Sequence, residues 1–202
     1  MGAQSLVDNY PIISDQITKQ ELRVILREAE RALSRAGAFV EFGCYAGTTS
    51  LFLERLFVAS GDAREFHVYD SFQGLPEKTA QDQSPSGEQF RAGELSVSRK
   101  DFIVNFKKAG LRLPRVHKGW FDELADSDVP DGIAFAFLDG DYYESVRVPL
   151  ELVESKLVPG AIIVIDDYAN LALPGAARAA GEWARAQGYE IRSEQSLGII
   201  HT

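Results

Sequence analysis

Two pairs of aspartates at the ends of apolar runs carry the strongest chemical signal in this sequence. FLDGDYYES contains Asp139 and Asp141, and VIDDY contains Asp166 and Asp167. Four carboxylates in one cleft would repel one another and raise each other's pKa values, and a hard divalent cation relieves that repulsion. Mg²⁺ prefers such oxygen ligands and keeps waters that a substrate can displace. The alternative is a set of separate structural caps, with Asp141 capping the next helix and Asp167 the next loop.

A glycine-containing loop is the second candidate site. In VEFGCYAGTTS, residues 40–50, Gly43 and Gly47 precede a helix expected to begin at Thr48, so a ligand could approach the backbone there. The loop is not the GxGxxG fingerprint of dinucleotide-binding proteins, and Glu41 would repel a pyrophosphate. A cationic ligand without phosphate, such as S-adenosylmethionine, fits better. The alternative is a plain structural turn with a solvated glutamate.

Asp70 ends the second expected strand. An acid at this place can accept hydrogen bonds from both ribose hydroxyls of an adenosine cofactor. The alternative is an ordinary helix cap or loop aspartate. With Glu41 upstream, the ribose contact is favoured.

Other reactive residue types give weaker signals. The three histidines fall within apparent strands and are expected to be packed or edge residues: His67, His117 and His201. Cys44 is expected to pack behind the cofactor loop, because no histidine partner lies nearby in the sequence. Three aromatic residues are expected to line the core or a pocket, and one of them could stack on an adenine: Phe72, Trp120 and Phe121.

Alternating strands and helices must position these residues. The apolar spacing from Leu22 to Leu33 predicts a helix over 18–36, with a capping box at Thr18 and Glu21 and a stop at Gly37. We expect strands at 38–43, 65–70, 114–119, 133–141 and 160–168, helices at about 48–59, 98–109, 142–157 and 174–187, and two closing strands in YEIRS and LGIIH. This order predicts a parallel sheet with helices on both faces. Ligands bind beyond the carboxyl ends of such strands, so the acids should converge on one rim.

Composition and net charge exclude some kinds of site and argue against some kinds of partner. The 202 residues suit one domain over 1–202, and a single cysteine excludes an intrachain disulfide and a Cys-rich zinc site. The net charge of −9 would repel a phosphate backbone, which argues against a nucleic-acid partner. No apolar run is long enough for a transmembrane helix, and the N-terminus does not look like a secretory signal, so no membrane partner and a cytoplasmic location are expected.

Residues 71–97 form a long polar segment rich in Gly, Pro and Gln. Loops of this length in compact domains are usually functional or disordered. We therefore expect a lid that is mobile without ligands and becomes ordered over the cofactor or the acceptor.

Six stretches together resemble the macrocin O-methyltransferase (TylF-like) family of S-adenosylmethionine-dependent sugar O-methyltransferases. They are VEFGCYAGTTS, VYDSFQGLPE, GELSVS, HKGWFDEL, AFLDGDYYES and PGAIIVIDDY, in the family's order. The resemblance implies an α/β, Rossmann-like class I methyltransferase fold. It would have a mostly parallel seven-stranded sheet, helices on both faces and an antiparallel last strand.

The resemblance also implies site roles. Asp139, Asp166 and Asp167 would hold one Mg²⁺, and Asp141 would be the general base, a role to which Asp139 also has a claim. Glu41 and Asp70 would hold the cofactor. Further cofactor contacts are expected in the matching stretches, at Gly43, Gly47, Thr48, Ser71, Lys118, Gly119 and Trp120.

These observations favour a Mg²⁺-dependent O-methyltransferase that moves a methyl group from S-adenosylmethionine to a hydroxyl of a small molecule, a sugar of a secondary metabolite. One alternative is a nicotinamide-dependent sugar oxidoreductase, but neither its pyrophosphate loop nor its Tyr-x-x-x-Lys pair stands in the expected place. Another is a receiver-like signalling domain, whose acid pair should follow the first strand and not the fifth. The sequence leaves open the acceptor and the oligomeric state, including a homo-oligomer.

Overall fold

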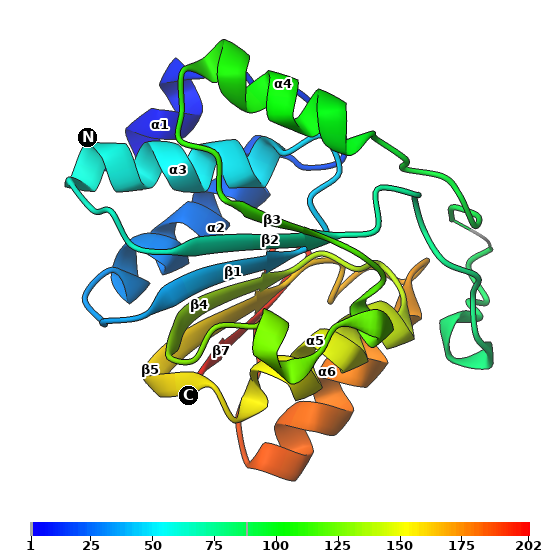
Figure 1. Cartoon of the computed structure of the whole chain (residues 1–202). Helices are drawn as coiled ribbons and strands as arrows, with labels where there is room; N and C mark the ends of the chain where they lie inside the picture. The colour runs from blue at the N-terminus through cyan, green and yellow to red at the C-terminus, as the bar shows by residue number, and fades with distance from the viewer. Residues whose placement is uncertain (1, 88) are drawn as a thin grey trace.

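Seven strands form one twisted sheet in the computed structural model, which describes residues 2–87 and 89–202 (Figure 1). Their order across the sheet is β3-β2-β1-β4-β5-β7-β6. The central strands β1 and β4 are buried along their whole length, because helices cover both faces of the sheet. The strands are β1 (Ala38–Phe42), β2 (Phe66–Asp70), β3 (Arg115–Lys118), β4 (Ile133–Leu138), β5 (Leu157–Ile165), β6 (Arg192–Glu194) and β7 (Leu197–His201).

The first five strands run parallel, and the last two form an antiparallel hairpin. Val40 of β1 is opposite Ala136 of β4 in the parallel part, whereas Val164 of β5 is opposite Ile199 of β7 in the antiparallel part. Strand β6 then pairs with β7 at the sheet edge. This topology confirms the predicted class I methyltransferase fold, including its antiparallel last strand.

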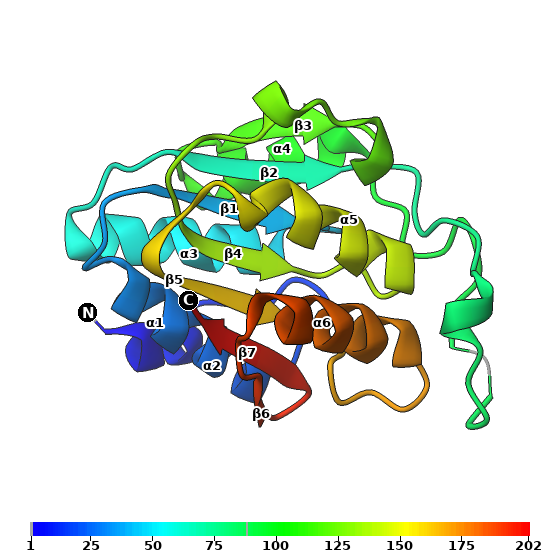
Figure 2. The same ribbon diagram turned by 90° about the horizontal axis from the view of Figure 1, so that it is seen from below.

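Helices cover the two faces unequally (Figures 1 and 2). One face carries α1 (Ala3–Asn9), α2 (Lys19–Ala32), α3 (Thr48–Ser60) and α4 (Arg99–Ala109), and the other carries α5 (Tyr143–Glu154) and α6 (Pro174–Gln187). The capping box of Thr18 and Glu21 is present at the start of α2. The sequence did not predict α1, whose Leu6 and Val7 are buried, and α2 ends before Gly37 in a turn over residues 33–35.

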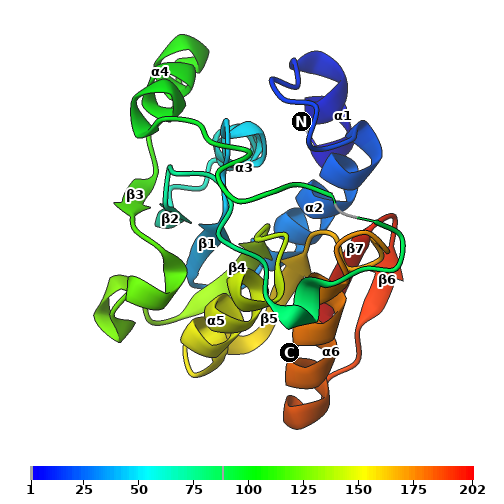
Figure 3. The ribbon, with the colours of Figure 1, turned by 90° about the vertical axis from the view of Figure 1, so that its right-hand side faces the viewer.

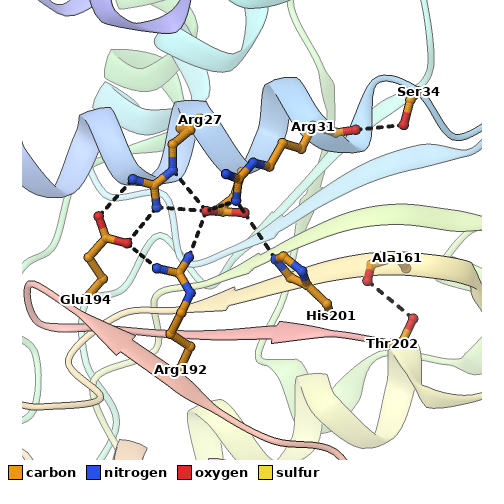
Figure 4. A network of polar contacts seen from close by, with 9 residues as sticks. Arg27, Arg31, Ser34, Ala161, Arg192, Glu194, His201 and Thr202 are labelled. Atoms are coloured by element: carbon orange, nitrogen blue, oxygen red, sulfur yellow. Dashed lines mark hydrogen bonds and ion pairs between the residues drawn. The ribbon is translucent and has the colours of Figure 1, made fainter.

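Polar contacts fasten α2 to the β6–β7 hairpin (Figure 4). Glu28 of α2 is fully buried, and its carboxylate accepts hydrogen bonds from Arg27, Arg31, Arg192 and His201. A buried carboxylate that accepts from three guanidinium groups and an imidazole is compensated for its lost hydration. The network therefore holds the antiparallel edge against the rest of the molecule.

The segment 71–97 crosses the carboxyl edge of the sheet, from the end of β2 towards α6 (Figure 3). It has no strand or α-helix among its described residues and contains one 3₁₀ turn, η1 (Ala80–Asp82). Residue 88, within the predicted lid, lies outside the described residues. No helix in the described part of the chain has the length and apolar character needed to cross a membrane.

Candidate active site

A cavity of about 410 Å³ opens at the carboxyl edge of the sheet. Its walls come from the loops after β1 to β5, from α5, from the segment 71–97 and from Gln16 near the N-terminus. The predicted residues that line it are Gly43, Asp70, Ser71, Trp120, Asp139, Asp141, Asp166 and Asp167. This is the place where parallel α/β sheets bind their ligands.

The two aspartate pairs lie side by side in this wall. The backbone N–H of Asp139 donates to the carbonyl of Phe42 at 2.8 Å, and that of Asp166 donates to the carbonyl of Leu138 at 2.8 Å. Both pairs therefore begin at the same level, on the neighbouring strands β4 and β5. Asn170 Nδ2 donates to Asp167 Oδ1 at 2.9 Å.

Burial raises the pKa values of all four aspartates, and repulsion by a neighbouring aspartate raises them further at Asp139, Asp141 and Asp166. Burial is the largest cause in each case, and it raises the pKa of Asp166 to about 8. The charge of Asp166 further raises the pKa of Asp139, and the charge of Asp167 further raises that of Asp141. Such a cluster favours either bound protons or a bound cation.

The donor set fits a divalent cation by its chemistry, because carboxylate oxygens are the ligands that Mg²⁺ takes. Among the described residues, however, no group of three or more His, Cys, Asp or Glu side chains has the arrangement of a metal site. The four carboxyl groups would have to turn towards a common point to share an ion.

Several cavity residues have left-handed backbone conformations that are rare outside glycine. Asp141 has a φ of 61° and Asp167 a φ of 54°, and Tyr45, Phe90 and Leu95 also have positive φ. Such conformations persist only where the surroundings hold them, and they are often found at functional sites. Both aspartates line the cavity in this conformation.

Asp70 ties the end of β2 to the glycine loop. Its Oδ2 accepts the backbone N–H groups of Cys44 at 2.9 Å and Tyr45 at 3.2 Å, and its Oδ1 accepts that of Phe72 at 2.7 Å. Each carboxylate oxygen has two acceptor sites, so Oδ1 can still accept a ligand hydroxyl. Asp70 therefore both shapes the loop and faces the cavity.

Glu41 is placed differently from Asp70. Its side chain is 1% exposed and does not line the cavity, and its Oε2 accepts the hydroxyl of Ser50 at 2.5 Å. Burial raises the pKa of Glu41 to about 8. The carboxyl group lies beneath the glycine loop, where it supports the start of α3.

The remaining predicted contacts divide into two groups. Ser71 and Trp120 are in the cavity wall, whereas four residues are not among those that line it: Gly47, Thr48, Lys118 and Gly119. The hydroxyl of Thr48 bonds to Ser14, and a Cβ on Gly47 would lie 2.8 Å from the ring of Phe102, so Gly47 allows α4 to approach α3.

The residues expected to have packing roles have them, and Cys44 and Phe121 also line the cavity. Cys44 is buried beside Asp70, and Phe72 packs edge-on against Phe102. His67 and His117 stack on each other at 5.2 Å between ring centroids. His201 belongs to the Glu28 network at the far edge of the sheet.

The sequence interpretation missed one wall of the cavity. Helix α5 contributes Glu144, Ser145, Arg147 and Val148, and the loop after β3 contributes Asp122. The spacing of i, i+1, i+3 and i+4 places the four α5 residues on one helix face, a signal that the sequence contains. Gln16, Gln89 and Phe90 gave no comparable signal, because only the fold brings them to the rim.

The family model "Macrocin-O-methyltransferase (TylF)" matches residues 14–193. Among curated proteins, this chain is similar to 8-demethyl-8-(2,3-dimethoxy-alpha-L-rhamnosyl)-tetracenomycin-C 4'-O-methyltransferase of Streptomyces olivaceus, with 36% identity over 139 residues, 66% of this chain and 53% of that protein. It is also similar to demethyldecarbamoylnovobiocin O-methyltransferase of Streptomyces niveus, with 30% identity over 147 residues, 65% of this chain and 53% of that protein. The matched regions therefore span about half the length of these relatives.

Solved structures share the fold. The O-methyltransferase NovP superposes with a TM-score of 0.79 at 23% identity, over 91% of this chain and 81% of that one. The O-methyltransferase TomG from Streptomyces achromogenes, solved in complex with S-adenosylmethionine, superposes with a TM-score of 0.62 at 14% identity, over 99% of this chain and 87% of that one.

Proposed function

Because the chain belongs to the macrocin-O-methyltransferase (TylF) family, we propose that it transfers a methyl group from S-adenosylmethionine to a sugar hydroxyl of a small molecule. The observation that carries this proposal is the cavity in which Asp70 and the four strand-end aspartates meet. The methyltransferase relatives described above give the oxidoreductase alternative no support. A sequence with net charge −9 also suits a small-molecule acceptor better than a nucleic acid, and we expect the protein to act in the cytoplasm.

The cofactor would lie along the Glu41–Gly47 loop with its ribose at Asp70. Gly43 has a φ of 85°, and a Cβ there would lie 1.9 Å from the carbonyl oxygen of Asp139, so the loop passes directly against the end of β4. That contact would bring the methyl donor close to the aspartates. The acidic wall suits the sulfonium and ammonium charges of S-adenosylmethionine.

Methyl transfer requires an acceptor oxygen aligned with the methyl carbon and a group that removes its proton. Asp141 is the candidate base, with Asp139 as the rival, because both line the cavity.

We further propose that activity depends on Mg²⁺, held by Asp139, Asp166 and Asp167. Their clustered charges and hard oxygen donors support this assignment. A bound cation would lower the pKa of the acceptor hydroxyl, which a carboxylate alone deprotonates poorly.

The S. olivaceus relative, whose name includes a rhamnosyl group, suggests the first acceptors to test. The test incubates the protein with deuteromethyl S-adenosylmethionine, Mg²⁺ and either an aryl α-L-rhamnoside or a catechol, and detects labelled product by mass spectrometry. Label on the rhamnoside, lost in excess EDTA, supports the proposal. Label on the catechol alone contradicts the sugar acceptor, and full activity in EDTA contradicts the metal.

A control separates binding from chemistry. Isothermal titration with S-adenosylmethionine in the presence of EDTA should show cofactor affinity within about threefold of that with Mg²⁺, because the cofactor site uses Asp70 and the glycine loop. Titration with NAD should show no binding. Binding of NAD alone would restore the oxidoreductase alternative.

A further inference from the structure

The segment 71–97 is fastened to the molecule by an unusual residue. Of the described residues between 73 and 97, only Asp82 is buried, at 3% exposure. Burying a charged carboxylate has a large cost in desolvation free energy unless hydrogen-bond donors surround it. Its partners therefore show what this burial achieves.

Both oxygens of Asp82 are hydrogen-bonded. Oδ2 accepts from the backbone N–H and the hydroxyl of Thr79, each at 2.8 Å, which closes the 3₁₀ turn η1 on itself. Oδ1 accepts from the backbone N–H of Tyr143 at 2.6 Å. Tyr143 is the first residue of α5, 61 positions along the chain.

Helix α5 has no side-chain cap from its own N-cap residue, Tyr142. The first N–H groups of a helix have no partner within the helix, and its N-terminus favours a negative charge. Asp82 supplies both the acceptor and the charge from a distant segment. It acts as the N-terminal cap that the sequence around α5 lacks.

Asp82 is closely packed between the N-termini of α5 and α6. A Cβ on Gly175, in the first turn of α6, would lie 1.9 Å from Asp82 Oδ1, so only glycine leaves room for the carboxylate between the two helices. Arg178 Nη1 donates to the carbonyl of Gln81 at 2.8 Å and holds η1 from the side of α6. The turn η1 therefore sits against the starts of both helices.

The capped residue follows directly on the turn that carries the candidate base. Asp141 has a φ of 61°, and within the same turn the N–H of Tyr142 donates to the carbonyl of Gly140 at 2.7 Å. A left-handed conformation at a non-glycine residue persists only where neighbouring contacts impose it. The hydrogen bond from the N–H of Tyr143 to Asp82 therefore also holds the backbone directly after this turn in place.

We propose that Asp82 is a positioning residue for methyl transfer: by capping α5 it holds the turn that directs Asp141 into the cavity, and so couples the segment 71–97 to the base. The inference rests on the proposed function insofar as it assigns Asp141 as the base. The coupling itself depends only on the cap.

Hydrogen exchange on the full chain without ligands tests the cap. Asp82→Ala should raise exchange about tenfold or more at the amides of residues 142–146. Ser84→Ala is the matched control, because it removes another bond of the same segment, from Ser84 Oγ to the carbonyl of Leu171 at 2.6 Å, and does not touch α5. Equal exchange at 142–146 in the two variants overturns the cap.

Kinetics with the aryl α-L-rhamnoside as acceptor test the coupling to the base. Asp82→Ala should lower kcat about tenfold or more with cofactor affinity within about threefold, and Asp82→Asn, which keeps an acceptor oxygen, should recover part of the loss. In an Asp141→Asn background, Asp82→Ala should have no further effect. Losses that multiply in the double variant overturn the coupling.

The two measurements separate the two proposals. Near-wild-type turnover of Asp141→Asn overturns the base assignment, and with it the catalytic part of this inference. The hydrogen-exchange experiment tests whether Asp82 caps α5, whether or not Asp141 is the base. Should Asp82→Ala fail to fold, Asp82→Asn replaces it: the amide cannot accept the bonds of Thr79 and of Tyr143 together, so exchange at 142–146 should still rise above that of Ser84→Ala, by less than in Asp82→Ala, and equal exchange overturns the cap.

Discussion

Replacing Gly43 by alanine should damage both stability and cofactor binding. Its φ of 85° costs an L-residue roughly 1–2 kcal/mol. The added Cβ would also lie 1.9 Å from the carbonyl oxygen of Asp139 and 2.9 Å from its carbonyl carbon. Both neighbours are backbone atoms, so the loop and the end of β4 must move apart, at an overpacking cost of about 1–3 kcal/mol. The expected loss in the free energy of unfolding is the sum, about 2–5 kcal/mol.

Gly61→Ala is the matched control, because Gly61 has a φ of 66° and no heavy atom within 4 Å of the added Cβ. Gly61→Ala introduces only the backbone strain and should lower the free energy of unfolding by about 1–2 kcal/mol. Urea denaturation measures both losses, and titration with S-adenosylmethionine should show unchanged affinity in Gly61→Ala and at least a hundredfold loss in Gly43→Ala. Equal losses of stability with intact binding in both variants would refute the close contact between the loop and β4.

Three further variants test other parts of the account. Glu28→Gln should lower the free energy of unfolding by about 1.5–3 kcal/mol at neutral pH. Although burial opposes it, hydrogen bonds from the surrounding arginines hold the pKa of Glu28 below 4.5. This contribution should therefore be present above pH 4.5 and be lost as the pH falls through the folded-state pKa, and a loss that does not diminish as the pH falls would contradict this. Burial lowers the pKa of His67 and of His117 below 6.5, so the stability that this pair contributes should be present above pH 6.5 and be lost as the pH falls through the folded-state values. The difference in melting temperature between the wild type and His117→Asn should therefore shrink over that range, and a difference that does not change with pH would exclude the pair as a cause. Asp70→Ala should weaken S-adenosylmethionine binding by about 1.5–3 kcal/mol in calorimetry, and unchanged affinity would remove the ribose from this position.

The sheet could be predicted because its central strands, such as β1 and β4, are short apolar runs that alternate with helices, and because helix-start signals such as Thr18 and Ser98 are local in sequence. Helix α1 could not be predicted in this way. It has no capping side chain or acidic first turn, and it is stabilised by packing of Leu6 and Val7 against the core.

The aspartate cluster could also be predicted, because strand order alone brings the ends of β4 and β5 together. Sequence could not show that Glu41 is buried beneath the loop while Asp70 faces the cavity, since both stand near strand ends. The difference depends on which face of the pleated strand each side chain occupies relative to the loop above it. Asp82 escaped notice for a similar reason: its partner, Tyr143, is distant in the chain, and no local pattern marks the contact.

The central claim is that Asp141 removes the proton of the acceptor. A single-turnover experiment tests it most directly, by comparing the wild type with Asp141→Asn. It measures methyl transfer from deuteromethyl S-adenosylmethionine to the rhamnoside and determines the cofactor affinity on the same samples. We expect the variant to bind the cofactor within about threefold of the wild type and to transfer the methyl group roughly 10²–10⁴-fold more slowly, the usual contribution of a positioned base. Near-wild-type transfer by Asp141→Asn would contradict the claim that Asp141 removes the proton of the acceptor.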